Sequence, residues 1–146
     1  MKTRFQHIFY WILLLTIFVA CSKGGTISDD SGTGPHEVTP SDTIAPVLEI
    51  TTPTASHVFT SGNTISVTGR ITDDLGLYRG SVRITNDANG GLLKEQLYEI
   101  HGIKLYDFNV AYPATVTTLS NYTVTVTFED HGLNETSKSV KVKVNP

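Results

Sequence analysis

Apolar and polar residues alternate along most of the chain from Asp42 to Pro146. The stretch 121–129 reads NYTVTVTFE, so that an aromatic or β-branched apolar side chain occupies every second position. Residues 63–71 and 136–144 follow the same rhythm. A two-residue period places one face of a strand in a core and the other in water, and β-branched side chains suit such half-buried pleated surfaces. The pattern therefore predicts a domain built from β-strands over residues 42–146.

Turn-forming residues interrupt this alternation at short intervals. Gly, Asn and Asp cluster at 61–63, 73–76, 89–91 and 130–132, where they favour tight turns. The alternation between them predicts seven strands, at residues 46–51, 63–72, 77–85, 92–100, 104–111, 121–129 and 136–144. A short helix remains an alternative for 92–100, which reads LLKEQLYEI. Seven short antiparallel strands in about 105 residues are typical of an all-β, immunoglobulin-like β-sandwich.

Two residues bear on how such a sandwich would be held together. Tyr122 stands near the start of the sixth predicted strand, two residues before a core position at Val124, as in the tyrosine corner of immunoglobulin-like domains. Cys21 is the only cysteine of the chain. The disulfide of antibody domains is therefore absent, and apolar packing must hold the two sheets.

The N-terminal segment has a different pattern. Lys2 and Arg4 precede the stretch 8–19, IFYWILLLTIFV, in which one threonine is the only polar residue. A basic start followed by an apolar run of this length is typical of a secretory signal. The run is too short to cross a hydrocarbon core of about 30 Å, which requires about 20 apolar residues.

The segment ends in Phe18-Val19-Ala20-Cys21. This resembles the lipobox of bacterial lipoproteins, although Phe18 stands where leucine is usual. The resemblance implies that residues 1–20 are a lipoprotein signal peptide and that Cys21 carries the lipid. A lone cysteine in a secreted chain has no partner for a disulfide, and acylation gives it a role. Cleavage by ordinary signal peptidase and an uncleaved anchor remain alternatives.

Residues 21–41 follow as a lipidated cysteine and a flexible linker. The sequence from Ser22 to Ser41 is rich in Gly, Ser, Thr, Pro and Asp and cannot bury enough apolar surface to offset the entropy of ordering. Removal of residues 1–20 leaves nine basic and 14 acidic residues. This charge excludes a basic patch for nucleic acid, so attachment to a membrane is expected through the lipid on Cys21.

The domain also resembles bacterial immunoglobulin-like repeats of extracytoplasmic proteins over residues 42–144. Their pattern is D-x-x-A-P-V, a later strand that ends in D-D-x-G, and a strand near the end followed by D-x-x-G-N. The matching residues are Asp42, Ala45, Pro46, Val47, Asp73, Asp74, Gly76, Asp130 and Asn134. The chain departs from the pattern at Leu133, which separates Gly132 from Asn134.

The whole plan is similar to a family of small Gram-negative lipoproteins of unknown function with one immunoglobulin-like domain. This resemblance implies a lipid-anchored protein of the Gram-negative cell envelope, at the outer membrane. Family members carry a histidine-rich stretch after the third strand, where this chain has NDANGGLLKEQ. A metal role for those histidines therefore does not transfer.

Acidic residues gather at one end of the predicted sandwich. If successive strands run in alternating directions, the loops 73–77, 101–103 and 130–135 share a pole with Asp42. Clustered carboxylates repel one another unless a cation neutralises them, and hard oxygen ligands suit Ca²⁺. Asp73, Asp74 and Asp130 are the candidate Ca²⁺ ligands, and no other cofactor is expected. The alternative is that each aspartate merely caps its own turn.

The loops 52–62, 86–91 and 112–120 are expected at the opposite pole. Phe59 and Tyr112 stand there among small polar residues, a composition that suits a glycan or protein ligand. The alternative is that both rings close the end of the core.

No catalytic motif is present: the chain contains no G-x-S-x-G, no H-E-x-x-H and no phosphate loop. We therefore expect no enzyme and no catalytic residues, with a metal-dependent hydrolase as the weaker reading. The sequence favours an envelope-anchored lipoprotein whose domain acts in binding, adhesion or scaffolding. A Ca²⁺-binding structural domain of an envelope complex is the alternative.

Overall fold

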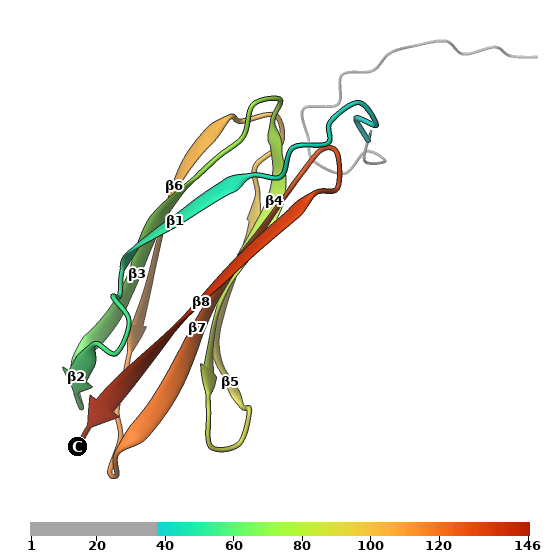
Figure 1. The fold of residues 1–146 in the computed structure, drawn as a ribbon. Coiled ribbons are helices and arrows are strands. Elements are labelled where there is room, and N and C mark those ends of the chain that lie inside the picture. Colours follow the sequence, from blue (N-terminus) through green and yellow to red (C-terminus); the bar gives the residue numbers. More distant parts are fainter. Residues whose placement is uncertain (1–37) are drawn as a thin grey trace, which may run out of the picture.

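A computed structural model describes residues 38–146. The predicted signal peptide and the lipid attachment at Cys21 lie outside the described residues. The described part contains eight strands (Figure 1). They are β1 (Val47–Thr52), β2 (Val58–Thr60), β3 (Thr64–Thr72), β4 (Leu77–Asn86), β5 (Leu92–Glu99), β6 (Leu105–Pro113), β7 (Ser120–Asp130) and β8 (Glu135–Asn145).

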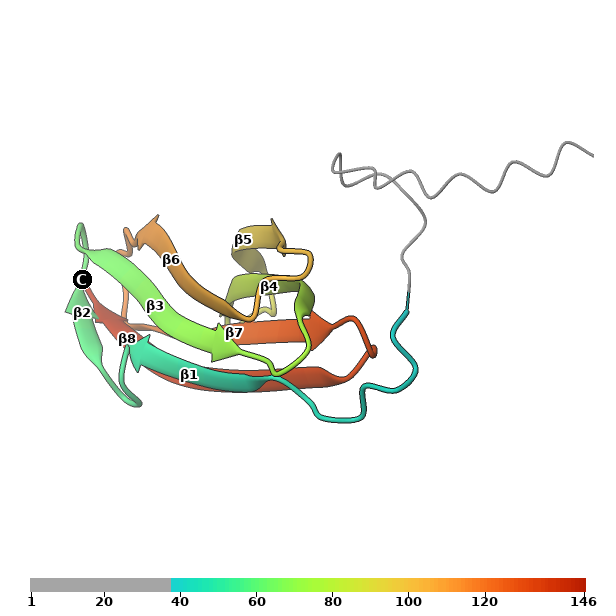
Figure 2. The same ribbon diagram turned by 90° about the horizontal axis from the view of Figure 1, so that it is seen from above.

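The strands form two sheets that face each other, which Figure 2 shows from above. The smaller sheet has the order β1-β3-β6, and the larger has the order β2-β8-β7-β4-β5. The fold is an immunoglobulin-like β-sandwich. Within residues 38–146, no helix has the length and apolar character needed to cross a membrane.

All seven predicted strands are present, and residues 92–99 form a strand rather than the alternative helix. The prediction of about seven antiparallel strands was incomplete, because β2 is an eighth strand that runs parallel to β8, with Val58 beside Lys143. Three residues are too few to display a two-residue period, so the sequence carries no clear signal for β2.

The core is filled by the alternating apolar residues of the two inner faces. Tyr122 is 3% exposed and Val124 is fully buried, which confirms the predicted core position at Val124, while the tyrosine corner itself stays a prediction. The largest fully buried side chains are Phe108, Phe128, Ile65, Ile71, Leu77, Ile84, Val67, Val82, Val124, Val126, Val142 and Val144.

Two glycines allow the two phenylalanines to meet in the middle of this core. Gly69 of β3 pairs with Phe108 of β6, and Gly80 of β4 pairs with Phe128 of β7. A Cβ atom at either glycine would overlap the ring opposite it. The two rings lie 5.6 Å apart between centroids. Each sheet thus uses a glycine directly across from a phenylalanine to bring that ring close to the backbone.

Candidate functional site

Three loops and the segment that leads into β1 meet at one end of the sandwich, which we call the anchor pole (Figure 1). It comprises the loops 73–76, 100–104 and 131–134 and the leading segment, residues 38–46. The backbone N–H of Asp73 donates to the Lys104 carbonyl at 2.9 Å, and the N–H of Thr39 donates to the His131 carbonyl at 2.7 Å. The prediction that these loops share a pole with Asp42 is confirmed.

Three carboxylates converge inside the anchor pole. Asp42, Asp73 and Asp130 each offer one oxygen, and these oxygens lie within 4.8 Å of one another. Asp42 is 4% exposed and Asp130 is fully buried. The structure therefore brings together two of the three predicted ligands, with Asp42 in place of Asp74. Asp74 is exposed, outside this group, and its backbone carbonyl accepts a hydrogen bond from Lys104 Nζ at 2.7 Å.

Two of the carboxylates use one oxygen to fix the local backbone. Asp42 Oδ1 accepts the N–H of Ile44 at 3.2 Å. Asp73 Oδ2 accepts the N–H groups of Leu75 at 3.0 Å and Gly76 at 2.6 Å. Aspartate favours such turns because its short side chain reaches the backbone two residues ahead. These bonds hold each carboxylate in one orientation and leave its second oxygen for other partners.

Asn134 ties Asp130 to the leading segment. Its N–H donates to Asp130 Oδ1 at 2.9 Å, and its Nδ2 donates both to Asp130 Oδ2 at 3.0 Å and to the Asp42 carbonyl at 3.1 Å. Gly132 permits the close approach, because a Cβ there would lie 2.5 Å from the Asp42 carbonyl oxygen. The β7–β8 turn therefore packs directly on residue 42.

The remaining oxygens define the electrostatics of the site. Asp42 Oδ2 and Asp73 Oδ1 are buried and accept no hydrogen bond within the described residues, although buried polar atoms are nearly always paired. Burial raises the pKa of the Asp42 carboxyl, and the neighbouring carboxylates raise it further, against the opposing effect of the Ile44 N–H. The arrangement is a cluster of three carboxylates, two of which have a buried oxygen without a hydrogen bond.

An aromatic cluster stands beside these carboxylates. The rings of Tyr78, His101 and His131 contact one another, with centroids 4.8 to 5.4 Å apart. Among the described residues, neither histidine joins a group of three metal-ligating side chains. The cluster therefore supports the loops through ring packing.

Phe59 and Tyr112, the predicted ligand-binding residues, lie at the opposite end, which we call the distal pole. Both side chains are half-buried against the core. The Phe59 ring lies 4.4 Å from the ring of His57, and the Tyr112 ring lies 6.4 Å from that of Tyr122. This gives each ring a packing role, and a binding role for either stays a prediction.

The loops of the distal pole hold one another in place. Ser61 Oγ donates to the Val116 carbonyl and accepts the Val116 N–H, both at 2.9 Å. The N–H of Asp87 donates to the Asn121 carbonyl at 2.9 Å. The loops 52–62, 86–91 and 112–120 thus lie at the same pole, as the strand count predicts.

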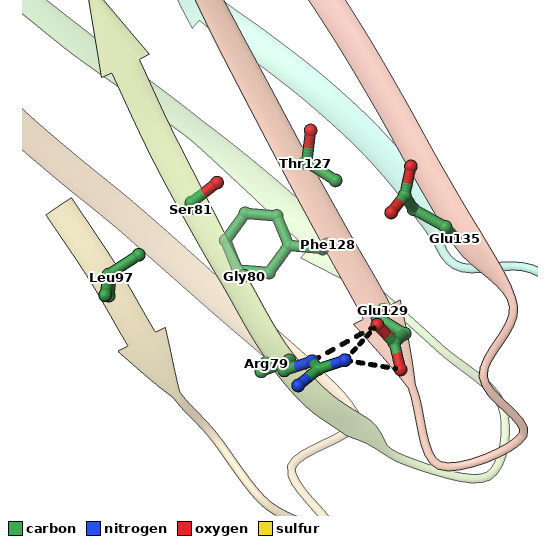
Figure 3. A pocket seen from close by; sticks show the side chains of 8 residues that line it. All are labelled: Arg79, Gly80, Ser81, Leu97, Thr127, Phe128, Glu129 and Glu135. Carbon is green, nitrogen blue, oxygen red and sulfur yellow. Dashed lines mark hydrogen bonds and ion pairs between the residues drawn. The ribbon is translucent and has the colours of Figure 1, made fainter. Parts of the chain in front are cut away.

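A shallow groove of about 260 Å³ lies on the larger sheet (Figure 3). Arg79 reaches across it to Glu129, with Nε and Nη2 3.2 and 3.0 Å from Oε2. The volume of this groove is below the roughly 300 Å³ of the smallest typical small-molecule pockets. A second groove at the anchor pole is lined by Val38, Thr39, Pro40, Leu75, Gly102 and His131. Neither groove is lined by the three carboxylates.

Sequence reasoning missed Asp42 as the third converging carboxylate. It placed Asp42 at the right pole, but residue 42 lies outside every strand, and its side chain reaches Asp73 and Asp130 only because the leading segment folds onto the β7–β8 turn. The one local sequence signal is the aspartate itself, whose short side chain favours a turn, and in the structure its Oδ1 accepts the Ile44 N–H.

The sequence matches no protein-family model, and a search of curated proteins gives no match. Among solved structures, the chain is similar to the CARDB domain of a Pyrococcus furiosus protein, which was crystallised in complex with di-metal ions. The two share 14% identity, with a TM-score of 0.38 over 70% of this chain and 93% of that one.

Proposed function

We propose that this protein is a lipid-anchored module of the Gram-negative cell envelope, held at the outer membrane through Cys21, with a binding or scaffold role. The observation that carries the proposal is that the leading segment enters the sandwich at one end and the distal loops lie at the other. The leading segment is bound to the anchor pole through Thr39 and Asn134, and the distal pole lies at the far end of the sandwich (Figure 1). An anchored chain would therefore hold the distal loops away from the membrane.

The burial of the carboxylates favours a structural role over catalysis. A metal-dependent hydrolase requires an open coordination position that substrate can reach. Asp42 and Asp130 are buried beneath the loops of the anchor pole, and they line neither groove described above. A glycan or protein ligand at the distal pole fits the proposal better than turnover at the anchor pole.

Cell fractionation tests the anchor directly. Cys21→Ala in the full chain should move the protein from the membrane fraction to the soluble fraction, because the chain has no second cysteine to carry a lipid. Thr26→Ala, a change in the same linker that leaves the lipobox intact, is the matched control and should stay with the membrane. Membrane partition of Cys21→Ala equal to that of the unmodified chain would place the anchor elsewhere.

A further inference from the structure

We propose that Asp42, Asp73 and Asp130 bind one Ca²⁺ ion, which fixes the leading segment to the sandwich. The site adds a ligand to the module proposed above and does not depend on the lipid anchor. Its three ligands come from the leading segment, the loop between β3 and β4 and the end of β7, so one ion would join three parts of the chain that are distant in sequence.

The spacing of the carboxylate oxygens suits one ion. Ca²⁺ binds oxygen at 2.3–2.6 Å, so two of its ligands lie at most about 5 Å apart. The three ligand oxygens lie within 4.8 Å of one another. This spacing is therefore within the range that one Ca²⁺ ion can bridge.

A second observation, independent of the clustering, points to a ligand. Asp42 is 4% exposed, and its Oδ2 is buried without a hydrogen-bond partner while Oδ1 is held by the Ile44 N–H. Asp73 repeats this division, with Oδ2 bound to the backbone and Oδ1 buried without a partner. A carboxylate that only caps a turn needs no buried second oxygen. Here one oxygen of each carboxylate accepts backbone N–H groups, and the other is buried without a partner, as an oxygen that binds a cation would be.

The donor set favours Ca²⁺ over other common ions. All three donors are carboxylates, the hard oxygen ligands that Ca²⁺ accepts in irregular geometry, with backbone carbonyls and water completing its coordination. Zn²⁺ prefers nitrogen and sulfur in a tetrahedral arrangement. Mg²⁺ requires a near-ideal octahedron and retains several waters, which suits buried carboxylates from three separate parts of the chain less well.

The consequence concerns the junction between linker and domain. Without an ion, three carboxylates at this spacing repel one another, and the leading segment is the part that can move away, since it is not a strand. With an ion bound, residue 42 becomes a fixed point from which the chain leaves the sandwich. The Ca²⁺ concentration around the cell would then determine the fraction of molecules in which the leading segment is held in place.

Calorimetric titration of Ca²⁺ into a chain that begins at Ser22, which retains every strand and core residue described above, tests the proposal. After treatment with a chelator, one Ca²⁺ should bind per chain, and the midpoint of thermal unfolding should rise with Ca²⁺ concentration. Asp42→Asn and Asp73→Asn should each weaken binding at least about tenfold, with circular dichroism spectra that show an intact fold. Asp74→Asn, which removes the same charge from the neighbouring residue, should bind as the unmodified chain does.

Three results would overturn the proposal. The first is the absence of both heat and a thermal shift at about 10 mM Ca²⁺, well above the roughly 1 mM of the weakest protein Ca²⁺ sites. The second is an equal loss of binding in Asp74→Asn, which would indicate diffuse surface charge. The third is binding of Mg²⁺ as tight as that of Ca²⁺. None of these results bears on the fractionation of Cys21→Ala, so the site and the anchor can fail separately.

Discussion

Individual side chains at the anchor pole combine local and long-range roles. Asn134 satisfies both oxygens of Asp130 and also reaches the carbonyl of Asp42, 92 positions earlier in the chain. Asp73 fixes its own loop with Oδ2, and its Oδ1 is buried without a hydrogen bond. Hydrogen bonds therefore order all three carboxylates of the pole, and Asp42 and Asp73 each keep one buried oxygen without a hydrogen bond.

An exposed ion pair on the smaller sheet gives a prediction at this scale. Arg70 Nε and Nη2 donate to the two oxygens of Asp107 at 2.7 and 3.0 Å. These hydrogen bonds, together with the arginine charge, lower the pKa of Asp107 below its ordinary value of 3.8. The pair therefore stabilises the fold above the unfolded-state pKa, and this contribution disappears as the pH falls through the lowered folded-state pKa.

Titration of Asp107 by NMR measures this shift. Arg70→Gln should return the pKa of Asp107 towards 3.8, with little change in stability at neutral pH, because solvent screens an exposed ion pair. An unchanged pKa in Arg70→Gln would mean that another group lowers it.

At the scale of elements, each of the two sheets pairs a glycine with a core phenylalanine on the neighbouring strand. Gly69 faces Phe108 in the smaller sheet, and Gly80 faces Phe128 in the larger sheet. Figure 3 shows the Phe128 ring beside Gly80. A glycine in a strand weakens the strand by itself, and here the ring from the neighbouring strand covers the exposed backbone.

Gly80→Ala should therefore destabilise the domain. The new methyl group would overlap the ring of Phe128, and overpacking of this kind costs about 1–3 kcal/mol. Urea unfolding measures the loss. Ser81→Ala, the next residue on the outer face of the same strand, should change the free energy of unfolding by less than about 0.5 kcal/mol. Equal effects of the two changes would contradict this account of the Gly80–Phe128 pair.

The strands were predictable from sequence because one-sided burial imposes a two-residue period, as in β7, where every second residue from Tyr122 to Asp130 is buried. The short strand β2 could not be predicted from sequence, since its pairing with β8 depends on a neighbour 85 positions away, with Val58 beside Lys143. The anchor pole was predictable from strand direction alone. The presence of Asp42 in the cluster, where the sequence predicted Asp74, could not be predicted, because it depends on how the leading segment packs on the β7–β8 turn.

At the scale of the whole molecule, the sandwich has two unlike ends. The anchor pole contains buried carboxylates and receives the segment that follows the predicted linker. The distal pole contains interlocked loops and two half-buried aromatic rings. The proposed lipid on Cys21 and the proposed Ca²⁺ site act at the same end, so together they would set both the attachment of the domain and the direction in which its distal loops point.

Hydrogen exchange of the leading segment tests this central claim most directly. We expect Ca²⁺ to slow the exchange of the Thr39, Asp42 and Ile44 amides, which donate to the His131 carbonyl, the Thr39 carbonyl and Asp42 Oδ1. The amides of the central strand β7 should exchange equally slowly with Ca²⁺ and with a chelator, because the core already protects them. Equal exchange of residues 38–46 in both conditions would contradict the account, since the ion would then have no effect on the order of the junction.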